Sequence, residues 1–293
     1  LADPTKSGSA AKAFEMVIQQ KMQELVTAAG AESDDILALG WTQGLQIIQA
    51  ASANARYFTD SAPKIPLDVS LGDAAIGMCI DFYGRFQSES VKLGPSPSRL
   101  QYLTPAGGSS VGVDPIGLLR GAPHRAVAEE FIAFVLSLEG QKLWNFQVGT
   151  SGGPRKYALR RLPVRKELYA SEFTPLRSDP EVMPYEDAKL FTYHPAWTAP
   201  LIRTLSFIIR VTCLDLHHEQ TEAWESLVKA GFPREAYKTF TDLSAVDYQA
   251  ARRHIKPTLA SANRIDEVRL AKQLSDIFRH QYQESARLAK EGK

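Results

Sequence analysis

An uninterrupted run of small and apolar residues is the feature that most constrains the fold. Every position from Ala74 to Ile80 is apolar or glycine, so a strand built from this run would be buried on both faces. Strands covered on both faces are typical of parallel sheets that carry helices on either side. We therefore expect a buried strand over Ala74–Tyr83 and an α/β architecture.

Shorter extended segments are predicted on either side of this run, at Leu1–Asp3, Gln101–Thr104 and Val111–Leu119. With Ala74–Tyr83 they supply the strands of a parallel or mixed sheet with helices on both faces. The extended segments alternate with helical patterns, which is typical of α/β proteins.

Apolar residues at helical spacing predict the helices. The first predicted helix follows a turn at Pro4–Ser9 and ends at Gly30, a common residue after the last helical turn. Further helices are predicted at Thr42–Ala53, His124–Leu136 and Leu138–Gln147. From Pro184 onward the chain is predicted to be mostly helical. The stripe of the first helix is Phe14, Val17, Ile18, Met22 and Leu25, and that of the last is Ile265, Val268, Ala271, Leu274, Phe278 and Tyr282.

The charge balance excludes one class of partner. The 293 residues carry a formal net charge of +1. A nucleic-acid-binding surface needs a concentration of positive charge to neutralise phosphates. We therefore expect no nucleic-acid partner.

Three segments together resemble a known family. They are DPTKSGSA at Asp3–Ala10, GDAAIG leading to IDFY at Gly72–Tyr83, and GAPH leading to FIAFVLSLEGQ at Gly121–Gln141. This pattern is similar to the ferric-ion-binding and related family of periplasmic solute-binding proteins, whose relatives carry phosphonates, sugar phosphates or polyamines. The resemblance covers about residues 1–165.

The resemblance implies a fold of the type 2 periplasmic-binding class, with two α/β lobes and a ligand cleft between them. The segment like Asp3–Ala10 opens the second lobe in that family, so we expect the N-terminal part of the first lobe to be missing. Residues 1–104 would form the second lobe, and residues 105–165 the return crossover and part of the first lobe. Residues 166–293 would form a mostly helical region that packs on the lobes. The apolar faces of Val111–Leu119 and of the helix from His124 would then be exposed or covered by another chain.

The function implied by the resemblance is that of the substrate-binding component of an ABC importer, not of an enzyme. Such a protein captures a small anionic solute, here an organic phosphate, a phosphonate or an iron complex, and docks on a membrane permease. Its location would be periplasmic or extracellular, attached to the membrane in Gram-positive-like hosts. It would be a monomer at full length and would need no cofactor, although a ferric ion, held by Tyr83 with Asp81 in place of a second tyrosine, stays open as an alternative.

Residues Thr5, Ser7, Gly8 and Ser9 are the first candidate ligand-binding residues. They precede or open a helix, where free backbone N–H groups carry a partial positive charge that attracts anions. Ser7 or Ser9 can also act as a plain helix cap, which needs no ligand. In the family, the matching serines and N–H groups hold an anion or the acidic group of the ligand.

The second group of candidates consists of Asp60, Ser61, Asp81 and Tyr83. The family contributes a polar loop to the cleft near the first two, and Asp81 can accept a hydrogen bond from a ligand amine. Ferric-binding relatives ligate iron through two adjacent tyrosines. Tyr83 matches the first of these and Gly84 stands at the second. We therefore expect an organic anion, with or without an amine, in preference to a bare ferric ion.

Two other functions stay open at this point. The chain can be the ligand-sensing domain of a signalling or regulatory protein, because such proteins use the same two-lobed fold. It can also be an enzyme that uses Asp60, Asp81 and Tyr83 as acids or bases, although no nucleophile, metal or phosphate-loop motif accompanies them. A DNA-binding or kinase segment elsewhere in the protein would favour the sensor.

Overall fold

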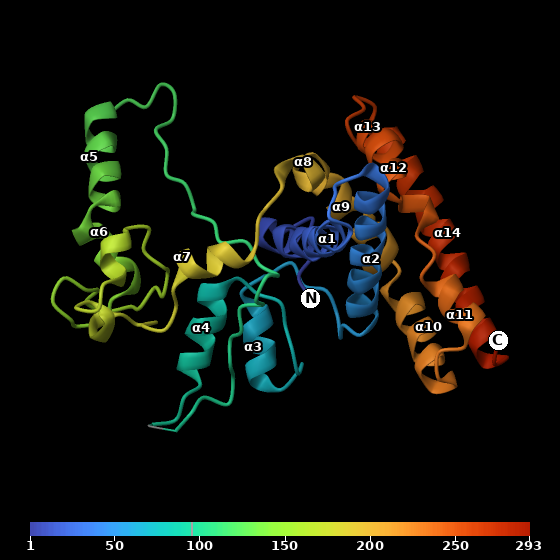
Figure 1. Ribbon diagram of the computed structural model, residues 1–293, viewed down its shortest axis with the longest axis horizontal. Coiled ribbons are helices and arrows are strands. Elements are labelled where there is room, and N and C mark those ends of the chain that lie inside the picture. The colour runs from blue at the N-terminus through green and yellow to red at the C-terminus, as the bar shows by residue number, and fades with distance from the viewer. Residues whose placement is uncertain (95) are drawn as a thin grey trace. The chain divides into compact units, whose positions relative to one another are not determined.

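A computed structural model describes residues 1–94 and 96–293 (Figure 1). These residues form two compact units. Unit 1 comprises Leu1–Cys79 and Tyr193–Lys293, and unit 2 comprises Ile80–Thr192. The chain therefore leaves unit 1 after residue 79 and returns to it at residue 193. The domain boundaries predicted after residues 104 and 165 both fall inside unit 2.

The predicted α/β fold is wrong. Within residues 1–94 and 96–293 the protein is helical, with no β-strand and no sheet, so it does not have the two-lobed periplasmic-binding fold. Leu1–Asp3 contributes a single parallel bridge, between Ala2 and Thr59. Gln101–Thr104 and Val111–Leu119 lie in irregular backbone.

The apolar run that suggested a buried strand is also irregular. The last residues of the predicted strand, Asp81–Tyr83, belong to the helix α4 (Asp81–Ser90), and the run Ala74–Ile80 precedes that helix without forming an element. The side chain of Ile76 is 88% exposed. A strand needs a neighbouring strand to satisfy its backbone N–H and C=O groups. The described part of the chain supplies none to this run.

Unit 1 is built from helices and short helical turns, two of which, η5 and η7, are π-helical. These elements are α1 (Gly8–Ala29), α2 (Asp34–Ala53), α3 (Lys64–Leu71), α8 (Pro195–Thr198), η4 (Ala199–Leu201), α9 (Ile202–Ile209), η5 (Arg210–Leu214), α10 (His217–Ala230), α11 (Arg234–Phe240), η6 (Ser244–Val246), α12 (Tyr248–Ala250), η7 (Ala251–Ile255), α13 (Lys256–Leu259) and α14 (Arg264–Lys290).

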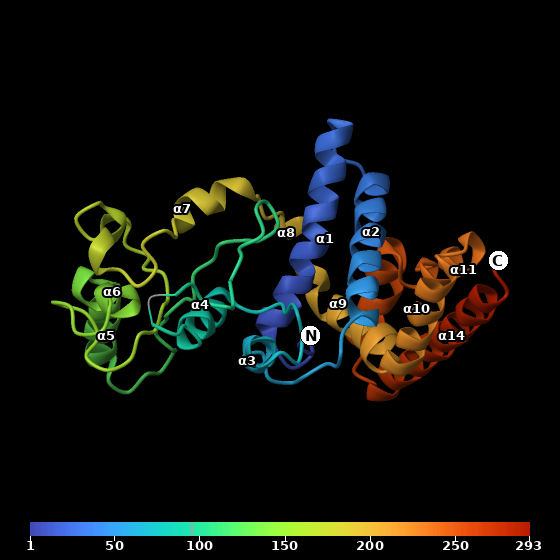
Figure 2. The same cartoon turned by 90° about the horizontal axis from the view of Figure 1, so that it is seen from below.

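Helices α1 and α2 lie side by side as a hairpin (Figure 2). The predicted first helix is confirmed, with Ser7 as its N-cap and Gly30, at φ 69°, as its C-cap. The two backbones approach closely because α2 carries glycines on the face toward α1. A Cβ atom on Gly40 would lie 2.6 Å from the Cα of Met22, and one on Gly44 would lie 2.8 Å from the Cα of Ile18.

The rest of unit 1 packs around the end of the chain. The fully buried rings of Phe278 and Tyr282 on α14 belong to the same apolar core as Trp41 of α2. The predicted last helix is thus confirmed, but its stripe is buried only from its middle onward: Ile265 is 61% and Val268 is 68% exposed. The C-terminal helix packs on unit 1 through the second half of that stripe.

One segment of unit 1, Pro195–Leu214, is long and apolar enough to cross a membrane by length and composition alone. Two thirds of it is buried in the structure. Its residues Leu205, Ile208 and Val211 are part of the apolar core. This burial gives the segment a packing role within its own unit.

Unit 2 has shorter elements and a charged centre. Asp179 is fully buried, and its carboxylate contacts the guanidinium groups of Arg160 at 2.5 Å and Arg85 at 3.4 Å, while Asn145 donates to it at 3.0 Å. A buried carboxylate needs such partners to offset the loss of water. The elements of this unit are α4, α5 (Arg125–Leu136), α6 (Leu138–Asn145), η1 (Lys166–Tyr169), η2 (Thr174–Leu176), α7 (Pro184–Asp187) and η3 (Ala188–Leu190).

The apolar face of α5 is exposed. The predicted helix is present, but none of its residues is buried, and Val127 and Phe131 are 65% and 59% exposed. Val113 and Leu119, before the helix, are 67% and 81% exposed. The exposure expected for this part of the chain is therefore observed, without the sheet that the expectation assumed.

Candidate functional site

The N-terminal end of α1 gathers most of the polar residues that the sequence singled out. Ser7 caps the helix, and its Oγ accepts from the N–H of Ala10 at 3.2 Å. The N–H groups of Gly8 and Ser9 donate to no acceptor within residues 1–94 and 96–293, and both residues are exposed. This end of a 22-residue helix thus presents two open donors with a partial positive charge.

A tight turn fixes the chain as it enters the helix. The carboxylate of Asp3 accepts from the N–H and from the hydroxyl of Thr5, both at 2.7 Å, and the Asp3 carbonyl accepts from the N–H groups of Lys6 and Ser7 at 3.2 and 3.1 Å. Aspartate favours such turns because its short side chain bonds to backbone two residues on. The turn leaves Thr5 and Lys6 exposed before the first helical residue.

A second segment is held beside this turn. The N–H of Asp3 donates to the carbonyl of Thr59 at 2.8 Å, and the N–H of Thr59 donates to the carbonyl of Leu1 at 2.9 Å. Beyond Thr59 the chain presents Asp60 and Ser61, both exposed, and the Ser61 N–H donates to the hydroxyl of Thr59 at 3.2 Å. The structure therefore brings Asp60 and Ser61 to the same end of unit 1 as residues 5–9.

Helix α3 packs against the N-terminal end of α1. Its residue Ile65 packs in a small buried cluster with Ala2 and with Ala10 of α1. Figure 2 shows α3 beside the N-terminal end of α1. Lys64 and Tyr57 both hydrogen-bond to the carboxylate of Asp68, which fixes the start of α3 to the segment before Thr59.

Several charged side chains lie at this end of unit 1. Lys6 forms no ion pair in the part of the chain described, and Asp60 likewise faces solvent without one. Asp3 is engaged in its turn and lies near Asp215, whose pKa is raised by its burial and by the negative charge of Asp3. Hydrogen bonds from Lys64 and then Tyr57 lower the pKa of Asp68.

Asp81 and Tyr83 lie elsewhere, on α4 of unit 2. Asp81 is the first residue of that helix and forms an ion pair with Arg85 at 2.6 Å, which neutralises it. The ring of Tyr83 is half-buried, with its centre 4.4 Å from that of Phe82. These two residues sit on a helix in place of the predicted strand end.

The part of the chain that the structure describes holds no group of three or more His, Cys, Asp or Glu side chains that could bind a metal.

The exposed ammonium of Lys6 was not among the candidate residues expected from the sequence, which were Thr5, Ser7, Gly8 and Ser9. Its position between Thr5 and Ser7 in the DPTKSGSA segment was visible in the sequence. Its lack of an ion-pair partner was not, because that depends on the fold around it.

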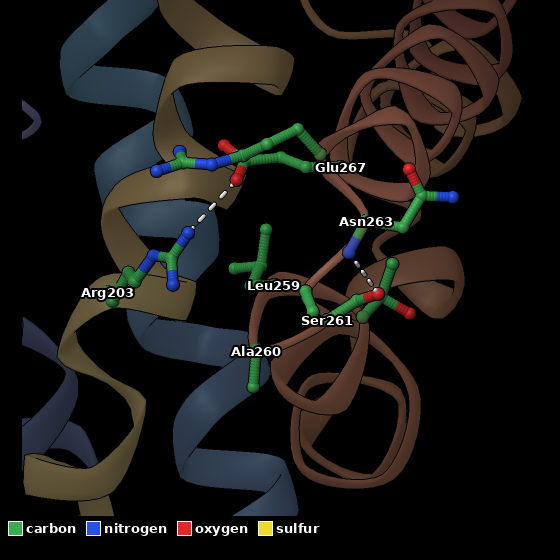
Figure 3. Close-up of a pocket in the computed structure, with 9 residues that line it drawn as sticks. Arg203, Leu259, Ala260, Ser261, Asn263 and Glu267 are labelled. Carbon is green, nitrogen blue, oxygen red and sulfur yellow. Dashed lines mark hydrogen bonds and ion pairs between the residues drawn. The ribbon is translucent and has the colours of Figure 1, made fainter.

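A separate hollow of about 330 Å³ lies where α13 meets the start of α14 (Figure 3). Arg203 and Glu267 in this hollow form an ion pair with each other at 3.0 Å. The hydroxyl of Ser261 donates to the carboxylate of Asp266 and accepts from the N–H of Asn263. Polar groups that satisfy one another have little left to offer a ligand. This hollow is therefore a weaker candidate than the end of α1.

Comparisons of the chain with protein-family models, with curated proteins and with solved structures found no match.

Proposed function

We propose that the chain binds a small anionic solute at the N-terminal end of α1, as the solute-binding component of an ABC importer. The observation that carries the proposal is the pair of open N–H groups on Gly8 and Ser9, next to the exposed ammonium of Lys6. Backbone N–H groups at the start of a long helix are a common anion site because their dipoles add.

The site suits an oxyanion such as a phosphonate or a phosphate ester. Its oxygens would accept from the N–H groups of Gly8 and Ser9, from the hydroxyl of Ser9 and from Lys6. Asp60 would disfavour a bare inorganic anion and favour a ligand that also carries an amine or a hydroxyl group. Capture of such a ligand requires no covalent chemistry, in keeping with a binding protein.

The wider biological setting of the proposal rests on the resemblance at Asp3–Ala10, Gly72–Tyr83 and Gly121–Gln141. It comprises a membrane permease as the partner and a periplasmic or extracellular location. The proposal does not include closure of two α/β lobes around the ligand, because residues 1–94 and 96–293 form no sheet.

The test is calorimetric titration of the protein with methylphosphonate, 2-aminoethylphosphonate and glucose 6-phosphate. We expect at least one of them to bind, and Ser9→Ala and Lys6→Gln each to weaken binding by about fivefold, the effect of one exposed charged contact. Ser7→Ala should weaken binding and also lower stability by about 1 kcal/mol, because Ser7 caps the helix.

The matched control is Ser33→Ala. Ser33 caps α2 through a similar bond, from the N–H of Ile36 to its Oγ at 3.3 Å. Its loss should lower stability by a similar amount and leave ligand binding unchanged. Equal binding by wild type, Ser9→Ala and Lys6→Gln would refute the proposal. So would a tyrosinate-to-iron absorption band with ferric citrate that disappears in Tyr83→Phe.

A further inference from the structure

Unit 2 carries a hollow of about 310 Å³ on its surface, formed by η1 together with α7 and η3. Its walls include Lys166 and Tyr169 from η1, Met183 and Tyr185 at the start of α7, and Lys189 from η3. This volume is at the lower end of the range that small-molecule sites occupy. None of these residues belongs to the anion site at α1.

Two tyrosine rings give the hollow a fixed aromatic corner. The centres of Tyr169 and Tyr185 are 5.8 Å apart, and their planes meet at 88°. The Tyr169 hydroxyl donates to the carbonyl of Pro163 at 2.8 Å, and the Tyr185 hydroxyl donates to the carbonyl of Val164. Both rings are thus held at their phenolic ends by neighbouring backbone. A flat apolar group can pack in such a corner without ordering the side chains first.

The charge around this corner is positive. The Lys166 ammonium lies 4.9 Å from the centre of the Tyr185 ring and forms no ion pair within the described residues. Lys189 is paired with Glu186 at 2.5 Å, which cancels both charges. Behind the Tyr169 ring, at 4.4 Å, lies the guanidinium of the buried Arg177.

Within residues 1–94 and 96–293, Arg177 forms no ion pair, so no carboxylate in direct contact cancels its charge. Its side chain donates to the carbonyls of Asp179 and Val182, at 2.7 and 2.6 Å. The Asp179 carboxylate is taken by Arg85 and Arg160. Burial raises the pKa of the Tyr169 phenol, so that ring stays neutral and supplies no opposing charge.

We propose that this hollow binds a small aromatic carboxylate, with its ring in the corner between Tyr169 and Tyr185 and its carboxylate on Lys166. A cation would need a free face of an aromatic ring, and the ammonium of Lys166 already lies over Tyr185. An apolar ligand without charge would leave Lys166 unpaired. The proposal does not depend on the solute bound at α1.

The experiment titrates the whole chain with four related probes: benzoate, its neutral isostere benzamide, acetate, and benzyltrimethylammonium. We expect benzoate to bind best, because it alone combines the ring with a negative charge. In Lys166→Gln, benzoate affinity should fall about fivefold and become as low as that of benzamide, as for the loss of one exposed ion pair. Tyr185→Leu should weaken benzoate and benzamide by the same factor, since both share the ring.

The control is Lys156→Gln. Lys156 lies 5.1 Å from the ring of Tyr157 in the same unit, but this exposed pair lines neither of the two hollows. Benzoate affinity should be unchanged in this variant. Unchanged benzoate binding in Lys166→Gln would overturn the proposal, as would equal binding of benzoate and benzamide by wild type, stronger binding of the cationic probe, or no binding of benzoate. Loss of phosphonate binding in Ser9→Ala would leave this result untouched, which separates the two sites.

Discussion

Replacement of Gly40 by alanine tests the close contact of α1 and α2. The added Cβ would lie 2.6 Å from the Cα of Met22, 0.8 Å short of ordinary contact at 3.4 Å, and also 2.8 Å from the Met22 backbone nitrogen. Backbone atoms cannot rotate away, so the helices must separate and the core between them must repack. Overpacking of this kind costs up to about 3 kcal/mol. Alanine returns about 1 kcal/mol through its better helix propensity. We expect a net loss of about 2 kcal/mol in the free energy of unfolding.

The assay is urea unfolding followed by far-UV circular dichroism. The control, Ala51→Gly, changes an exposed position on the same helix and should cost about 1 kcal/mol from propensity alone. If Gly40→Ala proves more stable than wild type, propensity alone governs the site. The inference that α1 and α2 approach too closely at Gly40 to admit a Cβ atom would then be refuted.

Two further predictions concern hydrogen bonds in unit 1. The buried hydroxyl of Tyr282 donates to the carbonyl of Thr212 at 2.9 Å and accepts from the amides of Gln49 and Gln220, each at 3.2 Å. Tyr282→Phe should therefore lower stability by about 1–3 kcal/mol, and a wild-type melting curve would contradict the network. Hydrogen bonds lower the pKa of Asp68 in the folded protein. The stability that Asp68 contributes is therefore fully present above its pKa in the unfolded chain, about 3.9, and is lost as the pH falls through its lower pKa in the folded protein. Stability measured against pH should show a smaller acid loss in Asp68→Asn than in wild type, because Glu219, Glu284 and Glu291 also have lowered pKa values and keep their share of it.

Helix α1 was predicted at both ends because its local signals are complete. For α1, a serine cap, an apolar stripe and a terminal glycine with positive φ all agree, and each acts within a few residues of the chain. The stripe of α14 failed at Ile265 and Val268 because periodicity shows which residues share a face. It does not show how far along the helix a partner extends.

The buried strand failed for a related reason. An apolar run such as Ala74–Ile80 satisfies the composition of a strand, but strand formation depends on a neighbour distant in sequence. Here Gly72 ends α3 with φ 84°, Asp81 starts α4, and the residues between them span the gap. No periodicity within the run carries that information.

Part of the candidate site could be predicted from local sequence, and part depends on residues distant in the chain. The cap at Ser7 and the open N–H groups after it follow from local sequence. Asp60 and Ser61 reach the same place only through the pairing of Thr59 with Leu1 and Asp3, more than 50 residues apart in the chain. The hollow at Tyr169 and Tyr185 was not predicted at all, because its walls are short turns without a repeating pattern.

The two units differ in what their interiors contain, and this gives them different responses to temperature. The interior of unit 1 is apolar, so its unfolding hydrates hydrocarbon surface and carries a large positive heat-capacity change. The centre of unit 2 is a carboxylate among guanidinium groups, and the cost of withdrawing such charges from water falls on warming. Cooling therefore weakens the main cohesive force of the first unit, whereas warming makes the charged centre of the second less costly to keep buried.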